Sequence, residues 1–300
     1  MCVILSTKVN PNYDLILISN RDEIFERSSE RMDFRDIVIN DDFKNKKTML
    51  MGLDNLNKGT WFCVDSEEKS FAVVLNVQST DNKDSNKFSR GYLPLRILKN
   101  GKSLPSSFSE FEKMYSKVKD TRFFKLIYGN FDFSSLNSSY QMISLADDKK
   151  PVYKNLKNKD IVVTSNQYES DTKEPIDLPK WDKIDIGEKL MEGLSSELDE
   201  ETLIDKSFQI SEHNTFPINN NNAAIKFGES KLKVRSSIFI PKHKVVYQDK
   251  ESFYGTRTTT VLLKRKDGSI KVIERERIDP SSCDKVFEFW SYDYIAQSRI

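Results

Sequence analysis

Apolar and β-branched residues open the chain in two short runs. The runs cover residues 2–8 and 13–19, and a turn signal, Asn-Pro-Asn, lies between them at 10–12. This pattern is typical of a β-hairpin. At about 3.4 Å per residue in antiparallel strands, the second strand returns to the start of the first. Arg21 and Asp22 are therefore predicted to lie beside Cys2.

Later segments carry strand and helix patterns in turn. Further strands are predicted at 61–65, 70–77, 123–132, 139–145, 161–165 and 234–240, with a hairpin at 256–264 and 270–277. Helices are predicted from a cap at Ser89 to Leu98, on an aromatic face from Phe108 to Val118, and at 184–198 and 200–206. A run of Asn at 219–222 indicates a surface loop. Strands at both ends with helices between them predict an α+β fold, and the lack of a Pro-, Gly- or Ser-rich linker predicts one domain over 1–300.

Cys2 directly follows the initiator Met1. Aminopeptidases remove Met1 before a small residue, so maturation is expected to leave Cys2 with a thiol and a free α-amine. These groups have ordinary pKa values of about 8.5 and about 8, which makes the amine a base of matching strength. Beside Arg21 the pKa of the thiol is expected to fall, and Cys2 to react faster than Cys63 or Cys283. The alternative is that Cys2 is only a small apolar residue of its strand.

Short motifs, in order along the chain, carry a resemblance to a known family. They are Cys2 with its strand, Asn20-Arg21-Asp22-Glu23, Gly52-Leu53-Asp54, Gly59-Thr60-Trp61, Ser89-Arg90-Gly91, Ser165-Asn166 and Tyr254-Gly255-Thr256-Arg257-Thr258. In this combination the chain resembles the transport and Golgi organisation protein 2 family, also called the NRDE family. That family looks related to the N-terminal nucleophile hydrolases, in the cysteine branch that cleaves bile-salt conjugates, penicillin V and related amides. The chain departs from the family pattern at Lys58 and Leu75, where Gly and Thr are usual, and in an insertion after Asn166.

The resemblance implies a fold and a mechanism. The fold is a four-layer αββα arrangement, with two stacked antiparallel sheets between helical layers. Cys2 would attack an amide or thioester carbonyl with its α-amine as base. Asp22 would orient the amine, and Arg21 would hold the thiolate or the leaving side. Asn166 and Asn76 would donate to the oxyanion.

Two more residues are candidates for substrate binding. Arg257 is expected to clamp a substrate carboxylate, and a salt bridge at a sheet edge is the alternative. Trp61 is expected to line the pocket or the core. Glu23 is expected to bind backbone or Arg27 rather than to join the chemistry. The expected function is thus a thiol hydrolase or acyltransferase that acts on a small-molecule acyl amide or thioester.

Composition excludes several other classes of protein. Lys plus Arg number 47 against 46 for Asp plus Glu, so no charge excess points to nucleic acid. No stretch approaches about 18 apolar residues, so no transmembrane segment is predicted, and neither is a secretory signal. Three cysteines without paired spacing fit a reducing compartment, and a cytoplasmic protein is expected. His213 and His243 show no metal-site spacing, so no metal or cofactor is expected.

A non-catalytic carrier is the alternative function. The resembled family is associated with Golgi organisation and secretion, with lipid and acyl-coenzyme A balance, and with haem mobilisation. Association with the Golgi or with mitochondria is a further expectation from the resemblance. Haem would need an axial ligand such as Cys2, His213 or His243, or a mainly apolar slot. The chain has no Cys-x-x-Cys-His haem motif.

Overall fold

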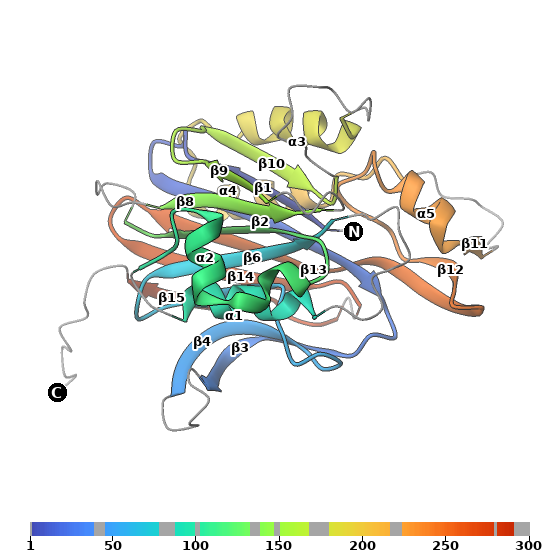
Figure 1. Ribbon diagram of the computed structural model, residues 1–300. Coiled ribbons are helices and arrows are strands. Elements are labelled where there is room, and N and C mark those ends of the chain that lie inside the picture. Colours follow the sequence, from blue (N-terminus) through green and yellow to red (C-terminus); the bar gives the residue numbers. More distant parts are fainter. Residues whose placement is uncertain are drawn as a thin grey trace.

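The computed structural model describes residues 2–38, 46–77, 88–99, 103–132, 139–146, 151–167, 180–216, 224–278 and 281–290 (Figure 1). Two β-sheets form the centre of this part of the chain. The eight-stranded sheet runs in the order β10 (Ile161–Ser165), β1 (Val3–Thr7), β2 (Tyr13–Ile24), β13 (Lys250–Arg265), β12 (His243–Tyr247), β11 (Ile225–Lys226), with β14 (Ser269–Glu276) paired to β13 and β15 (Lys285–Trp290) to β14. The seven-stranded sheet follows chain order through β3 (Ser29–Val38), β4 (Lys46–Asp54), β5 (Phe62–Asp65), β6 (Ser70–Asn76), β7 (Phe124–Asn130), β8 (Tyr140–Leu145) and β9 (Val152–Asn155).

β2 illustrates why the eight-stranded sheet is apolar on both faces. Side chains of a strand point alternately to the two faces. Leu15 and Leu17 pack between the two sheets, whereas Ile16 and Ile18 pack on the opposite face, under the helices. The near-continuous apolar run in the sequence follows from this burial on both sides.

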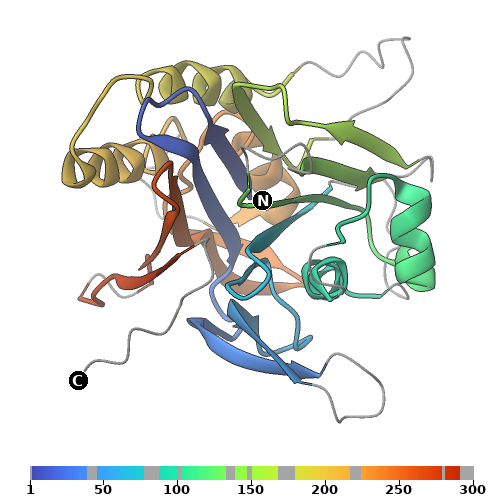
Figure 2. The ribbon, with the colours of Figure 1, turned by 90° about the vertical axis from the view of Figure 1, so that its left-hand side faces the viewer.

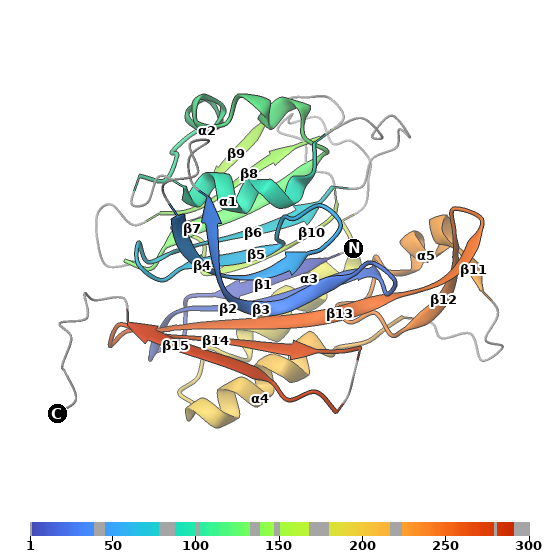
Figure 3. The same cartoon turned by 90° about the horizontal axis from the view of Figure 1, so that it is seen from below.

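Helices cover the outer faces of both sheets. α1 (Leu93–Leu98) and α2 (Phe108–Met114) pack on the seven-stranded sheet. α3 (Asp182–Glu192) and α4 (Glu200–Ser211) pack on the eight-stranded sheet. Figures 2 and 3 show these helix pairs, green and yellow, on opposite sides of the strands. η2 (Arg90–Tyr92), η3 (Ser116–Asp120) and α5 (Phe227–Lys233) are short additions.

The α+β class and both predicted hairpins are confirmed. In the first hairpin Val3 pairs with Asn20, and in the second Val261 pairs with Ile273. β2 continues beyond the predicted run to Ile24 because its far end pairs with β13. The single domain over 1–300 stays a prediction.

The strand predicted at 234–240 is wrong. Val234 caps the C-terminal end of α5, and the later backbone groups bond outside a strand ladder. The Phe239 N–H donates to the His213 carbonyl at 2.9 Å, and the Ile240 N–H donates to the Thr256 hydroxyl at 2.9 Å. Val234 and Ile240 are buried in a small separate core, whereas Ile238 packs in the core under α3 and α4.

Helix limits also differ from the predictions. The predicted helix to Val118 stops at Met114, because Tyr115 leaves the helical region with φ −144° and ψ 88°. α3 ends at Glu192, well before 198, and α4 extends to Ser211. The predicted loop at 219–222 lies outside the described residues.

Candidate functional site

The first hairpin sets the faces on which the candidate residues lie. Val3 is paired with Asn20, so Cys2 and Arg21 occupy the next position of the ladder and point to the same face. Cys2 belongs to the core between the sheets. The Arg21 guanidinium lies 4.0 Å from the centre of the Trp61 ring on that side, and its Nη1 donates to the Ser29 hydroxyl at 3.1 Å.

Asp22 lies one residue further along β2 and points to the opposite, helix-covered face. Its Oδ1 accepts a hydrogen bond from the Thr256 hydroxyl at 2.6 Å. Only its backbone approaches the thiol, since Cys2 Sγ donates to the Asp22 carbonyl at 4.0 Å. Burial raises the pKa of the Asp22 carboxyl. The sheet therefore separates the Asp22 carboxylate from the Cys2 and Arg21 side chains.

The Cys2 thiol is nearly enclosed, with 8 % of the residue exposed. Burial raises its pKa and outweighs the opposing charge of Arg21. This holds for the chain with Met1 attached; the lowered thiol pKa expected for the processed chain, with a free Cys2 amine, stays a prediction. Burial also raises the pKa of Cys63, whereas Cys283 is exposed.

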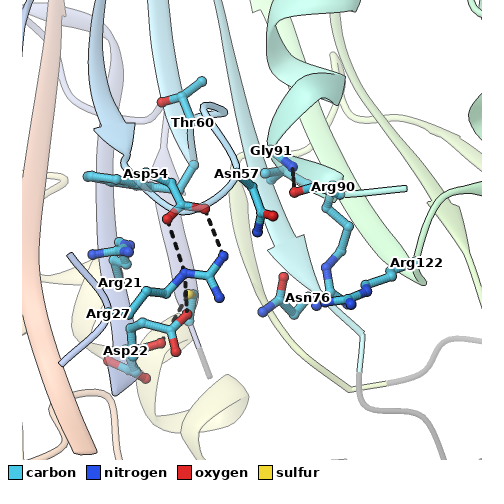
Figure 4. Close-up of a pocket in the computed structure, with 15 residues that line it drawn as sticks. Arg21, Asp22, Arg27, Asp54, Asn57, Thr60, Asn76, Arg90, Gly91 and Arg122 are labelled. Carbon is cyan, nitrogen blue, oxygen red and sulfur yellow. Dashed lines mark hydrogen bonds and ion pairs between the residues drawn. The ribbon is translucent and has the colours of Figure 1, made fainter. Parts of the chain in front are cut away.

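A pocket opens beside Cys2 at the edge where the two sheets meet. It encloses about 90 Å³. Its lining is Cys2, Arg21, Asp22, Glu23, Arg27, Asp54, Asn57, Thr60, Trp61, Val74, Asn76, Ser89, Arg90, Gly91 and Arg122 (Figure 4). Four arginines and three acidic residues line the pocket, and the carboxylate of one of them, Asp22, points to the other face of the sheet. The pocket therefore favours an anionic or neutral polar ligand over a cation.

Arg27 anchors one wall of the pocket. Its Nη2 and Nε donate to the two Asp54 carboxylate oxygens at 2.7 and 3.1 Å. The Glu23 carboxylate oxygen Oε2 lies 3.8 Å from Arg27 Nε. Burial would raise the pKa of Asp54, but the Arg27 bonds prevail and hold it below its ordinary value. The expected Glu23 to Arg27 contact is confirmed.

Arg90, Arg122 and Asn76 lie across the pocket from Arg21 and Arg27 (Figure 4). Arg90 Nη1 donates to the Phe123 carbonyl at 2.9 Å. No role was predicted for Arg90 from the sequence, although it lies in the Ser89-Arg90-Gly91 motif. Arg122 carries no sequence signal, because its position depends on the pairing of β7 with β6.

Backbone contacts join two of the motifs that rim the pocket. The Thr60 N–H donates to the Gly91 carbonyl at 2.9 Å, and a Cβ on Gly59 would lie 2.6 Å from Gly91 backbone. Lys58 adopts φ 54°, the left-handed region that favours glycine, where the resembled family usually has Gly. A Cβ on Gly52 would lie 2.3 Å from the Trp61 ring. The motif glycines are thus required by close packing around the pocket.

The two asparagines occupy different places. Asn76 lines the pocket and is exposed. Asn166 is buried, is absent from the lining, and donates from its side-chain amide to the Asn76 carbonyl. Ser165 donates to the Cys2 carbonyl at 2.8 Å, which ties this segment to the start of β1. The catalytic roles of both asparagines stay predictions.

Arg257 is also absent from the pocket lining. It is buried, and its Nη1 donates to the backbone carbonyls of Ile24, at 3.1 Å, and Arg27. These contacts support the turn that carries Arg27. Its role as a substrate clamp stays a prediction, as does that of Trp61, which does line the pocket.

Two features of the described residues bear on other functions. No group of three or more His, Cys, Asp or Glu side chains with the geometry of a metal site occurs there. No helix in the same residues is long and apolar enough to span a membrane. Neither His213 nor His243 lines the pocket.

Comparison with known proteins identifies the family. An uncharacterized protein of Saccharomyces cerevisiae, YGR127W, is 28% identical over 310 residues, which cover 96% of this chain and 95% of the yeast protein. The sequence model of the Transport and Golgi organisation 2 family matches residues 1–279. The chain therefore belongs to the Transport and Golgi organisation 2 family.

Proposed function

We propose that this protein is an N-terminal-cysteine hydrolase or acyltransferase that acts on a small acyl amide or thioester after removal of Met1. The observation that carries the proposal is the placement of the Cys2 and Arg21 side chains on one sheet face beside a polar pocket. A reactive thiol next to a fixed cation is a common device for nucleophilic catalysis. A purely structural cysteine would not require this arrangement.

In the proposed reaction, Cys2 Sγ bonds to the acyl carbon while the α-amine of Cys2 takes the thiol proton. Collapse of the tetrahedral intermediate breaks the carbon to nitrogen or carbon to sulfur bond, and the α-ammonium returns the proton to the leaving group. Water or another acceptor then attacks the acyl-enzyme. The Asn76 amide, exposed in the pocket, would stabilise the oxyanion, an effect typically worth about 2.7 to 4 kcal/mol.

Asn166 and Asp22 act in this proposal through other groups. Asn166 holds the Asn76 backbone, and Asp22 is placed behind the strand that carries Cys2. Asp22 would stabilise the α-ammonium formed during the reaction. Arg21 would stabilise the thiolate across the strand pair.

We further propose a fold relationship with the N-terminal nucleophile hydrolases. The two helix-covered sheets with a shared core between them support it. The proposed nucleophile at the start of a central strand supports it as well. A shared fold does not by itself establish catalytic activity, so the proposed activity rests on the arrangement of the site.

The carrier alternative has less support from the pocket. Haem needs an apolar slot or an axial ligand, whereas the lining is mostly charged and polar and the enclosed space is about 90 Å³. Ligand pockets for larger molecules usually hold about 300 to 1,000 Å³. Roles in Golgi organisation, lipid balance or haem mobilisation stay proposals from family membership.

The test begins with the intact mass of protein from its native host, because the mechanism needs a free Cys2 amine. Wild type, Cys2→Ala and the exposed-site control Cys283→Ala are then assayed on a panel of acyl amides and acyl-coenzyme A esters, with haem titration in parallel. We expect turnover by wild type and Cys283→Ala and none by Cys2→Ala. Processed wild type without turnover, together with haem binding that survives Cys2→Ala, would overturn the proposal in favour of a carrier.

A further inference from the structure

Lys183 is a fully buried lysine on the helical side of the eight-stranded sheet. It lies in the first turn of α3, and none of its surface is exposed. Its Nζ has no hydrogen-bond partner among the described residues. Lysine is almost never fully buried unless paired, so this position requires an explanation.

Helix packing directs Lys183 toward the sheet. Gly187 lies four residues later, on the same face of α3. A Cβ on Gly187 would lie 2.9 Å from both Leu5 and Val163, so α3 approaches β1 and β10 closely along this face. The Lys183 side chain therefore enters the layer between helix and sheet, the same layer into which Asp22 points.

The charged groups that face Lys183 come from three elements. β2 contributes Asp22, and Cys2, directly before β1, acts from the other face of the sheet; both act on Lys183 electrostatically. The segment after α5 contributes Arg235, whose guanidinium lies 5.3 Å from the Trp181 ring, and Lys183 Nζ lies 5.5 Å from that ring. β10 presents the apolar Val163 there.

These surroundings make the charge of Lys183 sensitive to pH. Burial lowers the pKa of Lys183 to about 8, while Asp22 and Cys2 act to raise it. In return, the Lys183 charge lowers the pKa of Asp22 against the opposing effect of burial. Lys183 therefore changes charge near neutral pH, in a layer where water does not screen it.

We propose that Lys183 is a positioning residue whose ammonium charge, from the helical side of the sheet, keeps Asp22 ionised and favours the thiolate of Cys2. The consequence for catalysis rests on the proposed function, because it matters only where Cys2 is the nucleophile. The electrostatic effect on the thiol does not require turnover. Lys183 would thus tune the site without touching the pocket, whose lining does not include it.

The test measures the rate of Cys2 alkylation by iodoacetamide as a function of pH, followed by peptide mass mapping. The protein carries Cys283→Ala, so that the exposed thiol does not compete. We expect Lys183→Met to slow Cys2 alkylation about tenfold at pH 7, the change in thiolate fraction for one pKa unit. The matched control is Lys180→Met, because Lys180 is exposed and pairs with Asp185 and Glu188 at 2.5 and 2.9 Å. It should leave the rate unchanged.

Lys183→Arg supplies a second measurement if the Met variant does not fold. Arginine keeps its charge at every pH of the assay. Alkylation of Cys2 should rise steadily through pH 8 in the Arg variant, whereas in wild type the rise should flatten where Lys183 loses its proton. A folded Lys183→Met with the wild-type rate, or identical pH profiles for Lys183→Arg and wild type, overturns the inference. If wild type turns over substrate but neither Lys183 variant changes the alkylation of Cys2, only this inference is refuted. If the variants change the alkylation as expected but wild type shows no turnover, only the proposed function is refuted.

Discussion

Replacing Gly59 by alanine tests whether the pocket rim is held by backbone packing. The added Cβ would lie 2.6, 2.7 and 2.8 Å from the C, Cα and O atoms of Gly91. Cβ atoms in proteins essentially never come within 3.0 Å of such neighbours, and here no flexible side chain is present that could move away. One of the two backbone segments must shift by several tenths of an ångström.

The magnitude follows from two contributions. Overpacking of this kind costs about 1 to 3 kcal/mol. A shift also weakens the hydrogen bond from the Thr60 N–H to the Gly91 carbonyl, now 2.9 Å long, which contributes about 1 kcal/mol. We expect Gly59→Ala to lower the free energy of unfolding by about 2 to 4 kcal/mol.

Thermal unfolding of three alanine variants provides the assay. A Cβ on Gly91 meets its nearest atom at 3.1 Å, and a Cβ on Gly228 meets nothing within 4 Å. Gly228 lies in α5, where alanine is favoured over glycine by up to about 1 kcal/mol. We expect Gly228→Ala to have the highest melting temperature of the three variants, Gly91→Ala an intermediate one and Gly59→Ala the lowest. Equal melting temperatures for Gly59→Ala and Gly228→Ala would refute the close-packing argument.

Three further predictions concern charge and burial. Lys183→Met should raise the free energy of unfolding at pH 7 by up to about 3 kcal/mol, since burial lowers the pKa of Lys183 from 10.5 to about 8 at about 1.36 kcal/mol per unit. The unfolded chain binds more protons between these values, so wild-type stability should rise with pH across that window, and a flat urea-denaturation profile would contradict this. Arg27→Ala should lower the free energy of unfolding by about 1 kcal/mol at pH 7, because the ion pair with Asp54 is lost. The difference from wild type should vanish as the pH falls below the ordinary carboxyl pKa of 3.8 and Asp54 becomes protonated. A difference in unfolding free energy that persists at pH 2 would argue against an ionic origin. In protein that retains Met1, iodoacetamide should label exposed Cys283 before Cys2, since burial raises the pKa of the Cys2 thiol, and mapping that finds Cys2 labelled first would count against that burial.

The sequence was informative where the pattern is local. The first hairpin could be predicted because its two apolar runs and its turn lie within about twenty residues, and its register then brings Arg21 next to Cys2. β3 was not predicted, for the opposite reason. β3 lies at a sheet edge with mostly exposed or half-exposed residues, so its polar sequence shows little strand periodicity. At 234–240 the apolar residues pack into two different cores, and an apolar run alone does not distinguish this arrangement from a strand.

The site was only partly predictable for a similar reason. Arg27 and Asp54 meet through the packing of two sheets, and no short-range spacing encodes that contact. Lys183 was passed over because lysine is normally exposed, and its burial depends on the close approach of α3 at Gly187. Asn166 and Arg257, for which roles at the substrate are predicted, are not among the residues that line the pocket. Their positions follow from side-chain direction, which motif order does not specify.

The alternation of Arg21 and Asp22 across β2 has a consequence for how sequence variation would be tolerated. Side chains of this strand that face the pocket are placed to contact a bound ligand, whereas the Asp22 carboxylate and the neighbouring side chains on the other face pack against the protein. A saturation mutagenesis scan scored separately for ligand affinity and for turnover should therefore show a two-residue periodicity. Under the proposed function, odd positions near Arg21 would affect both scores, and even positions near Asp22, together with Lys183 on α3, would reduce turnover at unchanged affinity.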